Sequence, residues 1–334
     1  ASLMDKLRQN FQFAPGGEFA VEVDPRTVDA ARLATLSRLG FNRLSFGVQD
    51  FDPAVQKAVH RVQSQTQVFD CVAAARDLGF ESINLDLIYG LPLQTPESFR
   101  RTLGTVIELR PDRIALYAYA HLPERFKPQR RIDALSLPSA ETKVGMLASS
   151  IAMLTEAGYD YVGMDHFALP DDALAVAKRQ GRLHRNFQGY STQPDCDLIG
   201  LGVSAIGRMG VTHGQNAKTL PEYYDLLSQN RLPVVRGVSL SRDDLVRRAV
   251  IMGIMCQGLV QYESIELAYI VEFARYFAPE LETLRQFARS GVVTLNDDSF
   301  GLTEAGWYLA RAVAMVFDRY LRDDQKRARF SKIL

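Results

Sequence analysis

Several polar residues stand where predicted β-strands end, and their types suit the binding of a small polar ligand. Glu22 lies in an apolar run that begins at Ala20, Gln49 closes a run that begins at Leu44, and Asp86 lies in an aliphatic strand. A carboxylate accepts two hydrogen bonds from a ribose diol, and an amide both donates and accepts. Because the carboxyl ends of parallel strands converge on one mouth of an α/β barrel, these residues would meet there. The spacing predicts one polar site built from several strands.

Each of these carboxylates also has a structural interpretation. Glu22 lies in a strand that we expect to be buried, where an unpaired carboxylate is costly. An ion pair with Arg43 on the next strand would satisfy it as well as a ligand would. Asn84 and Asp86 share one face of their strand, which indicates either a lined pocket or a buried hydrogen-bond network. The residue types leave these alternatives open.

Gly47 and Arg61 are open to two interpretations as well. A glycine inside a strand marks the close approach of a ligand or of another backbone, or it allows packing against a helix. Arg61 follows a predicted helix and could cap its carbonyl end. It could equally clamp a ligand carboxylate through its planar guanidinium.

The chain shows no set of residues with the spacing of a metal site. Its three cysteines, Cys71, Cys196 and Cys256, are widely separated and have no histidine cluster beside them. Their odd number argues against a disulfide framework and fits a reducing compartment. Asp165 and His166 close a predicted strand, and adjacent strand residues face opposite ways, so they do not form a catalytic dyad. The prediction is that this chain binds no metal by itself, and no catalytic residue is assigned.

The elements that would position the polar residues alternate between strand and helix in the first half of the chain. Predicted strands cover residues 19–23, 43–48, 83–88, 113–119 and 159–164, and predicted helices cover 28–39, 53–60, 67–78, 96–110 and 139–157. Four or five such units predict a partial barrel, because a complete one has eight. Residues 170–182 are predicted as a helix and a linker. The glycine-rich residues 184–207 are predicted as an extended segment at the edge of the barrel.

Helical patterns dominate from about residue 220. Predicted helices cover 220–229, 242–256, 263–277, 281–290 and 304 to about 321, and a hairpin is predicted over 291–303. Helices followed by a hairpin and a helix resemble a winged-helix arrangement. The fold class is therefore α/β, with a partial barrel over residues 1–215. A mainly helical, winged-helix-like C-terminal domain would cover residues 216–334.

Composition and charge limit the possible functions. Hydrophobic residues make up 47% of the 334 residues, which suffices for two domains. The 39 basic residues balance 39 acidic ones, which argues against nucleic acid or an anionic membrane as a partner. No apolar stretch is long enough to span a bilayer. We expect a cytoplasmic, monomeric protein.

The strand ends fall within longer sequence motifs. These are Glu22-Val-Asp-Pro, Gly40-Phe-Asn-Arg-Leu-Ser-Phe-Gly-Val-Gln-Asp50, Asn84-Leu-Asp-Leu-Ile-Tyr-Gly-Leu-Pro92, Gly163-Met-Asp-His-Phe-Ala168, His184-Arg-Asn-Phe-Gln-Gly-Tyr190 and Gly200-Leu-Gly-Val-Ser-Ala-Ile206. Together they resemble the oxygen-independent coproporphyrinogen III oxidases, or coproporphyrinogen dehydrogenases, a family of radical S-adenosylmethionine (SAM) enzymes. The resemblance covers essentially the whole chain, and the combination of motifs is what makes it specific. It implies a partial (βα) barrel that holds a [4Fe-4S] cluster and two SAM molecules.

The resemblance also implies roles for individual residues. Gln49, Arg61 and Asp86 would hold the ribose and methionine parts of one SAM, with Arg61 on the methionine carboxylate. The backbone of Ala120 would meet the adenine. These implied roles agree with the chemistry of the side chains, because a carboxylate suits a ribose and a guanidinium suits a carboxylate.

A second SAM is implied to lie against Glu22 and the backbone of Ile206, with Gln188 beside it. In the implied reaction, two propionates of coproporphyrinogen III lose CO2 and become vinyl groups, which gives protoporphyrinogen IX for haem synthesis. An electron donor and an electron acceptor, both unidentified, are further implied partners. Arg185 and Arg208 flank the glycine-rich segment and are hypothesised to meet the substrate carboxylates.

Two motifs of the family are not found in this chain: the Cys-x-x-x-Cys-x-x-Cys loop that holds the cluster, and a glycine-rich motif after the second strand. A helix predicted over residues 2–11 has no strand before it. We therefore expect that the parent protein has further sequence before Ala1 and that this chain alone is inactive. Two alternatives stay open: a haem-binding chaperone relative, which the stretch Phe187-Gln-Gly-Tyr190 disfavours, and a cluster-free barrel acting as a lyase or isomerase.

Overall fold

The structure is a computed structural model that describes residues 2–194 and 196–324 of the chain. Its contacts divide the chain into two compact units. The division falls inside helix α7 (Ala173–Arg179), so that the first unit runs to Ala175 and the second begins at Val176. Within the described residues, no helix has the length and apolar character needed to cross a membrane. The domain division near residue 215 stays a prediction.

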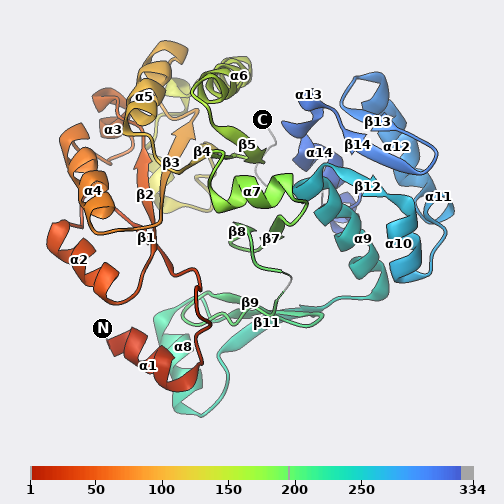
Figure 1. The fold of residues 1–334 in the computed structure, drawn as a ribbon, viewed down its shortest axis with the longest axis horizontal. Helices are drawn as coiled ribbons and strands as arrows, with labels where there is room; N and C mark the ends of the chain where they lie inside the picture. Colours follow the sequence, from red (N-terminus) through yellow and green to blue (C-terminus); the bar gives the residue numbers. More distant parts are fainter. Residues whose placement is uncertain (1, 195, 325–334) are drawn as a thin grey trace. The chain divides into compact units, whose positions relative to one another are not determined.

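A six-stranded sheet organises the first unit, with strand order β1-β2-β3-β4-β6-β5 (Figure 1). Its strands are β1 (Ala20–Val23), β2 (Arg43–Gln49), β3 (Ser82–Tyr89), β4 (Arg113–Ala118), β5 (Asp160–Gly163) and β6 (His166–Ala168). Strands β1 to β4 pair in parallel, whereas β6 pairs antiparallel with both β4 and β5. The first four strands confirm the parallel βα arrangement predicted from the sequence.

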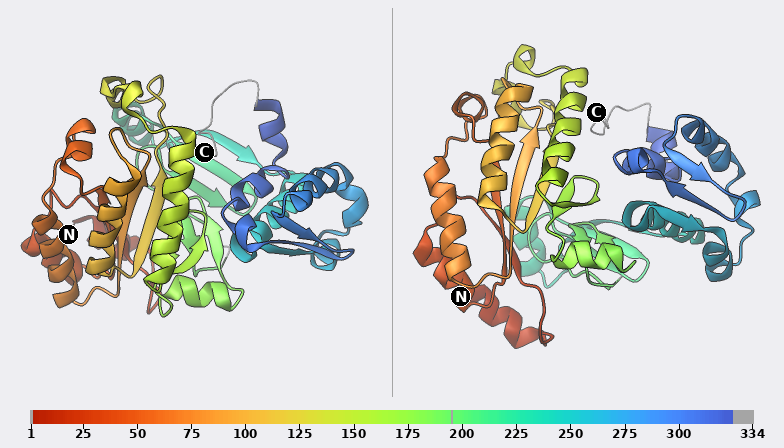
Figure 2. Two further views of the ribbon diagram at one scale, coloured as in Figure 1. Left: turned by 90° about the horizontal axis from the view of Figure 1, so that it is seen from above. Right: turned by 45° about the horizontal axis from the view of Figure 1, so that its top comes forward.

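Helices connect the parallel strands and pack on one face of the sheet; Figure 2 shows two of them, α5 and α6, side by side in gold and yellow-green. The helices of the first unit are α1 (Ser2–Asn10), α2 (Ala30–Arg38), α3 (Pro53–Ala58), α4 (Gln65–Asp77), α5 (Pro96–Leu109) and α6 (Ala140–Glu156). Side-chain caps explain where they begin. Thr95, for example, accepts a hydrogen bond from the backbone N–H of Ser98 at 3.1 Å, and Pro96 fills the first helical position.

Strand β2 shows how the core forms on only one face of the sheet. Leu44, Phe46 and Val48 are at most 1% exposed and belong to the core that the helices cover. Each such burial stabilises the fold by roughly 1.5–3 kcal/mol. Because successive side chains of a strand point to opposite faces, the residues between them lie on the other face. That second face is polar, with Arg43 and Ser45 only partly buried.

The last strands of the first unit differ from the sequence-based prediction. One strand was expected over residues 159–164, with Asp165 and His166 at its end. The chain instead turns at Met164, whose φ of 48° is left-handed, and returns as β6. The return buries Phe167 to 1% exposure beside Ile114 of β4. His166 therefore begins a strand, and the expected strand end is wrong.

The second unit contains three small antiparallel sheets and a set of short helices. Its strands are β7 (His184–Asn186), β8 (Gly189–Ser191), β9 (Ile206–Met209), β10 (Thr212–Asn216), β11 (Val234–Ser239), β12 (Leu259–Gln261), β13 (Val293–Leu295) and β14 (Ser299–Leu302). Its helices are α8 (Leu220–Ser228), α9 (Arg242–Met252), a π-helical turn (Gly253–Gln257), α10 (Tyr262–Tyr269), α11 (Phe273–Tyr276), α12 (Ala278–Arg289), α13 (Glu304–Trp307), α14 (Ala310–Met315) and α15 (Arg319–Asp324). The predicted hairpin is confirmed as the β13–β14 pair.

Several predicted extents in the second unit are wrong. The segment 184–207 folds into the β7–β8 hairpin and the start of β9 rather than one extended piece, and β11 was not predicted. The helix expected over 263–277 breaks at Ile270, whose φ is 53°, and becomes α10 and α11. The helix expected from residue 304 is divided into α13, α14 and α15. Helical periodicity continues across these breaks, which is why the sequence did not show them.

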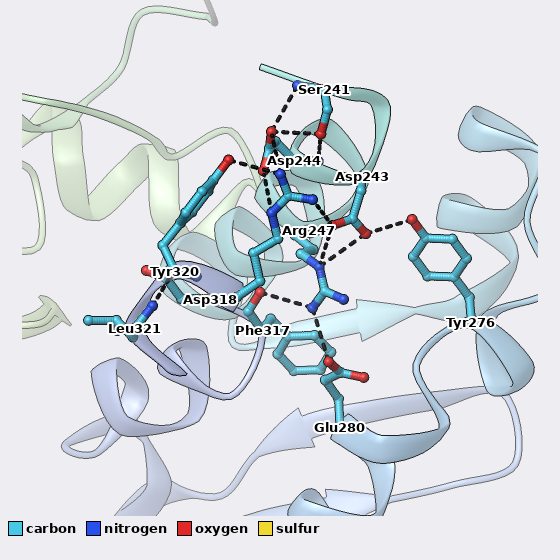
Figure 3. Close-up of polar contacts among 11 residues, drawn as sticks. Ser241, Asp243, Asp244, Arg247, Tyr276, Glu280, Phe317, Asp318, Tyr320 and Leu321 are labelled. Atoms are coloured by element: carbon cyan, nitrogen blue, oxygen red, sulfur yellow. Dashed lines mark hydrogen bonds and ion pairs between the residues drawn. The ribbon is translucent and has the colours of Figure 1, made fainter. Parts of the chain in front are cut away.

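A network of ion pairs joins α9, α12 and the start of α15 in the second unit (Figure 3). Arg247 of α9 bonds Asp243 at 2.9 Å and Glu280 of α12 at 3.0 Å, and Glu280 is only 2% exposed. Arg319 bonds Asp243 at 2.7 Å and Asp244 at 3.2 Å. Burial alone would raise the pKa of Asp243, but hydrogen bonds from Tyr276 and Arg247 outweigh it and lower that pKa. Each guanidinium of this network is thus paired with two carboxylates.

Candidate functional site

The polar face of the β1–β4 sheet is the first feature of the candidate site. Parallel sheets ordinarily bury apolar residues on both faces. Here the second face carries polar residues from neighbouring strands at matching positions: Glu22 of β1 pairs in register with Ser45 of β2, which pairs with Asn84 of β3. In the next row, Gly47 of β2 pairs with Asp86 of β3. The predicted convergence of residues from separate strands is therefore present in the structure.

Asp86 lies at the centre of this face and is held by two neighbours. Ser45 donates a hydrogen bond to one carboxylate oxygen at 3.0 Å, and Asn84 donates to the other at 2.8 Å. Asn84 also donates to Ser45 at 2.8 Å, which closes a triangle. Burial raises the pKa of Asp86, against these two hydrogen bonds, and the charge of Glu22 raises it further. The shared face predicted for Asn84 and Asp86 is confirmed.

Arg61 crosses strand β2 at Gly47. Its Nη2 donates to the Gly47 carbonyl at 2.7 Å, and its Nη1 lies 3.4 Å from the carboxylate of Asp24. A Cβ atom at Gly47 would lie 2.9 Å from Nη2, so a side chain there would displace the guanidinium from this position. The backbone N–H of Arg61 caps helix α3 by donating to the Gln56 carbonyl at 2.8 Å, while its side chain makes the close approach predicted at Gly47. The Nε of Arg61 is buried and has no hydrogen-bond partner within residues 2–194 and 196–324.

Asp24 is fixed by Arg26 and stays charged. Arg26 donates to both carboxylate oxygens, with Nη2 at 2.6 Å and Nε at 3.0 Å. The side-chain hydrogen bond from Arg26 is the largest influence, and it lowers the pKa of Asp24 to about 2. Arg61 therefore faces a permanent carboxylate on one side and an open position at Nε. A guanidinium held in this way suits a second carboxylate, supplied by a ligand.

Glu22 differs from its predicted environment. The strand that carries it was expected to be buried, but Glu22 is exposed, because β1 is the edge strand of the described sheet. The proposed ion pair with Arg43 is also wrong, since Arg43 bonds Glu18 at 2.6 Å. Within the described part of the chain, Glu22 has no side-chain hydrogen bond or ion pair. Its carboxylate is available to a ligand.

A cavity of about 470 Å³ opens at the carboxyl ends of β2 and β3. Gln49 and Arg61 line it together with Ile88, which follows Asp86 on the same face of β3. Its wall consists of Gln49, Val59, His60, Arg61, Ile88, Leu91, Tyr119, Pro128, Gln129, Arg131 and Ile132. The size is within the range of small-molecule sites. Apolar walls with two guanidinium groups and two amides suit a ligand that has both a flat apolar part and a charged part.

Ala120 lies just beyond β4, next to this cavity wall. Its carbonyl accepts a hydrogen bond from Gln129 Nε2 at 3.0 Å, and Gln129 Oε1 accepts from the N–H of Leu122 at 2.5 Å. Gln129 therefore anchors the loop that contains the short 3₁₀ turn Lys127–Arg131. This contact places Ala120 at the cavity and leaves its contact with an adenine a proposal.

The remaining predicted site residues belong to the second unit. Gln188 is exposed in the turn between β7 and β8, and Ile206 is the half-buried first residue of β9. Arg185 lies over the ring of Tyr190 at 4.8 Å, and Arg208 donates to the Cys196 carbonyl at 2.5 Å. Five of the seven predicted cofactor-binding residues therefore belong to the first unit, and Gln188 and Ile206 belong to the second.

The paired glycines 200 and 202 have a structural explanation in the second unit. A Cβ at Gly200 would lie 2.7 Å from the Ile206 carbonyl carbon, and one at Gly207 would lie 2.9 Å from the Leu198 carbonyl oxygen. The two backbones therefore press against each other. Gly202 has a φ of +102°, a conformation that favours glycine. These glycines serve backbone packing in this segment.

The cysteines of the described residues do not form a cluster. Cys71 packs in the core of the first unit, as predicted, while Cys256 is buried and Cys196 exposed in the second. No group of three histidine, cysteine, aspartate or glutamate side chains within the described ranges could hold a metal ion.

Comparisons with known proteins assign the chain to a family. A model of the radical SAM superfamily matches residues 2–106, and a model of the HemN C-terminal domain matches residues 240–309. The chain is 47% identical over 332 residues to the oxygen-independent coproporphyrinogen III oxidase of Escherichia coli (strain K12), covering 99% of this chain and 73% of the relative. It is 48% identical to the protein of that name from Pseudomonas aeruginosa, covering 99% of this chain and 72% of the relative.

The chain belongs to the oxygen-independent coproporphyrinogen III oxidase family. A solved structure of a member, coproporphyrinogen III oxidase from Escherichia coli, described as a radical SAM enzyme, matches with a TM-score of 0.93. That match has 48% sequence identity and covers 96% of this chain and 74% of the other. The predicted resemblance and the predicted α/β fold with a C-terminal helical domain are confirmed. Family membership implies SAM and a [4Fe-4S] cluster as cofactors.

The residues of the first unit fit the chemistry of SAM. The partnerless, buried Nε of Arg61 offers a donor to an amino-acid carboxylate. Asp86 offers acceptors to ribose hydroxyls, and the apolar side chains of Ile88 and Leu91 line the cavity where a flat base would bind. The described cysteines do not fit a [4Fe-4S] cluster, which is held by several thiolates at one place.

Sequence reasoning missed several residues that shape this site. Ile88 could have been found, because it shares the face of Asp86 by the two-residue period of a strand. Asp24 stands two residues after Glu22, and its short spacing to Arg26 hinted at a local pair. Gln129 gave no signal, because it reaches the cavity through the conformation of a loop.

Proposed function

We propose that this chain serves in an oxygen-independent coproporphyrinogen III oxidase and holds SAM on the polar face of its first sheet. The observation that carries the proposal is the buried Nε of Arg61, which has no partner among the described residues, at a cavity whose neighbouring strand carries the partly buried carboxylate of Asp86, in a chain of this family. Each propionate that reacts would be converted to a vinyl group, CO2 and a proton, with the release of two electrons. An electron donor and an acceptor, both unidentified, complete the balance.

The proposed role of the first unit is to bind and orient SAM. Arg61 would pair with the methionine carboxylate through the position that is open at Nε, and Gln49 and Asp86 would hold the ribose. The backbone of Ala120 would meet the adenine. When bound, SAM and the cluster supply the hydrogen-abstracting radical, and the residues of this chain hold the precursor in place and exclude water.

The rest of the proposal follows the family resemblance. A second SAM would contact Glu22, Gln188 and the backbone of Ile206. Glu22 supports this assignment because its carboxylate has no side-chain partner among the described residues. The enzyme would act as a cytoplasmic monomer. The described cysteines do not provide the ligands of a cluster, and the inactivity of this chain alone stays a prediction.

A binding experiment with Asp86→Ala tests the proposal. Removing a charged acceptor of ribose hydroxyls should weaken SAM binding by about tenfold or more, since hydrogen bonds to charged groups contribute roughly 1.5–3 kcal/mol. Isothermal titration calorimetry of this chain with SAM gives the dissociation constant. Asp77→Ala, an exposed carboxylate of α4 in the same unit, is the matched control and should bind normally. Equal affinity of the Asp86 variant and the control would remove Asp86 from the site.

A further inference from the structure

Strand β2 ends in a turn that strains the backbone of Gln49. The N–H of Asp50 donates to the carbonyl of Val48 at 2.9 Å, two residues back, and the φ of Gln49 between them is +68°. This hydrogen bond and this φ define a γ-turn of the left-handed kind, which is rare and costs energy in a residue other than glycine. Strained backbone of this sort persists only where the surroundings enforce it.

The register of the sheet changes at the same place. Gly47 pairs with Asp86, but the next pair joins Gln49 with Leu87, so β2 has one residue more than β3 between these pairs. Such a bulge bends a strand and redirects a side chain. The bulge and the γ-turn together aim Gln49 into the cavity at the strand ends. Its Nε2 lies over Gly47, 3.0 Å from where a Cβ would be.

A buried carboxylate, Asp50, enforces this turn. Asp50 is 1% exposed, and one of its oxygens accepts hydrogen bonds from Thr102 Oγ1 at 2.7 Å and from the N–H of Asp52 at 2.6 Å. Its other oxygen accepts from the side-chain amide of Gln94. Thr102 also accepts from the N–H of Phe51 at 3.3 Å. The residues that follow Gln49 are thereby tied to α5 and to the loop after β3.

Side-chain amides hold the backbone on both sides of Gln49. Gln63 donates to the Val48 carbonyl at 2.6 Å, and Gln56 donates to the Asp50 carbonyl at 2.9 Å. Gln56 also accepts from the N–H of Gln63 at 3.1 Å, which links the two amides. Both glutamines are at most 6% exposed. The strained peptide units are therefore fixed by buried groups rather than by water.

The same network reaches the end of β3. Gln94 donates to the Ile88 carbonyl at 2.9 Å and accepts from the N–H of Leu91 at 3.0 Å. Ile88, Leu91 and Gln49 all line the cavity. One buried network thus sets the position of both strand ends that form the cavity wall.

We propose that the Asp50 network is a positioning device that holds Gln49 in a strained turn and so preforms the SAM site. Asp50 and Thr102 are positioning residues, because they act through Gln49 and do not line the cavity. The proposal rests on the proposed function for the identity of the ligand. The strain itself can be measured without any ligand.

The first experiment measures the strain through Cys71, which is buried in the same core as Val48. Pulsed thiol modification followed by peptide mass spectrometry gives the protection of Cys71 in Gln49→Gly and in its matched control, Gln49→Ala. If residue 49 is held in a left-handed turn, Gln49→Gly should protect Cys71 about fivefold better than Gln49→Ala, because a side chain is costly in that conformation. If residue 49 lies in an ordinary strand, Gln49→Gly should protect Cys71 about two- to fivefold less well, because glycine loses more conformational freedom on folding. Lower protection with glycine would overturn the proposal.

A second pair of variants tests whether the network enforces the strain. Thr102→Val removes the hydroxyl that bonds Asp50 and keeps the shape of the side chain, while Thr102→Ser keeps the hydroxyl. With valine at residue 102 the turn should relax, so the ratio of Cys71 protection between Gln49→Gly and Gln49→Ala should fall towards one. With serine it should stay at about fivefold. A ratio that valine leaves unchanged would show that Asp50 and Thr102 do not hold the turn.

SAM binding then separates this inference from the proposed function. Thr102→Val should weaken SAM binding by about three- to tenfold, and it should have no further effect in a Gln49→Ala background, because it acts through Gln49. An additional loss in that background would overturn the positioning role. If Gln49→Ala itself leaves SAM affinity unchanged while the Cys71 ratios hold, the strained turn stands and the role of Gln49 in the proposed function fails.

Discussion

The two charged clusters of the molecule differ in how completely their groups are paired. In the second unit, Arg247 has two carboxylate partners, and hydrogen bonds overcome burial to lower the pKa of Asp243. In the first unit, Arg61 has a buried Nε without a partner in the described residues, and burial raises the pKa of Asp86. Among the described residues, the first cluster therefore leaves a buried donor without a partner, whereas both charged nitrogens of Arg247 that face the second cluster are paired.

This difference separates a structural role from a binding role. A network whose carboxylates have lowered pKa values gains stability from its charges, because the ionised form is preferred in the folded state. A cluster whose carboxylate has a raised pKa loses stability when it ionises. Such a cluster is retained where a ligand completes it, which is why perturbed groups gather at functional sites. The comparison therefore supports a folding role for the cluster around Arg247 and the proposed binding role for the one around Arg61.

The largest effect, a loss of stability of the second unit, is expected from Arg247→Ala. It removes the guanidinium that lies 3.0 Å from Glu280, a carboxylate that is only 2% exposed, and breaking a buried pair in this way costs about 3–5 kcal/mol. Urea denaturation followed by the fluorescence of Trp307, the only tryptophan of the chain and part of the second unit, measures the loss. SAM affinity should be unchanged.

Arg285→Ala is the matched control for this prediction. Arg285 pairs with Glu282 on the same helix, α12, but both side chains are more than half exposed, so the loss should stay below about 0.5 kcal/mol. If the two arginine variants lost equal stability, the network in Figure 3 would not hold the second unit together.

Asp50 and Asp86 of the first unit should make stability depend on pH with the opposite sign to Asp243 and Asp244 of the second. Raised carboxyl pKa values stabilise the fold below the usual value of 3.8, and that stability is lost as pH rises through the raised pKa. Asp50 and Asp86 act in this way in the first unit. Lowered pKa values stabilise above 3.8, and that stability is lost as pH falls through the lowered pKa; Asp243 and Asp244 act so in the second.

One buried cysteine in each unit makes this prediction measurable. Cys71 reports on the first unit and Cys256 on the second, when protection from a thiol reagent active in acid is read by mass spectrometry. Relative to Asp86→Asn, the wild type should gain protection at Cys71 as pH falls from 7 towards 4. Relative to Asp243→Asn, it should lose protection at Cys256 below about pH 4. If the difference in cysteine protection between the wild type and its asparagine variant changed with pH in the same direction in both units, the comparison would be contradicted.

The sequence was sufficient for the parallel strands because their signals are local. Strands β2 and β3 show aliphatic runs with polar residues at every second position near their ends, and that alternation predicted the shared face of Asn84 and Asp86. The motifs around Gln49 and Asp86 were enough to reach the correct family. Both the alternation of polar and apolar residues and the motifs can be read from one sequence, so no knowledge of the fold was required.

The partners of the site residues could not be predicted, because they depend on how loops bring distant residues together. The sequence predicted that Arg61 follows a helix, but it did not show that the guanidinium crosses Gly47 and reaches Asp24. Glu22 was expected to be buried, and its position at the sheet edge is a property of strand order. The strained turn at Gln49 has no local signal, since glutamine has no preference for a left-handed backbone. It is set by Thr102 and Gln94, more than forty residues away along the chain.

The smallest effect of these variants is expected from Ser45→Ala, which tests how the first cluster binds SAM. Ser45 donates to Asp86 at 3.0 Å, so its loss removes one of two side-chain hydrogen bonds that favour the carboxylate form. SAM affinity should fall about two- to fivefold at neutral pH. The pKa of Asp86 should rise further, so the loss of affinity should grow as the pH is lowered. Titration calorimetry at several pH values measures both.

Ser149→Ala is the matched control, because this hydroxyl in α6 donates only to a backbone carbonyl of its own helix. A loss of affinity at Ser45 that is the same at every pH would mean that Ser45 acts by shape and not through the charge of Asp86. With the predicted pH dependence, the first cluster loses binding when a donor is removed, whereas the second loses folding when Arg247 is removed. The same kind of change then has a different consequence in each unit, because only one of the two clusters is completed by a ligand.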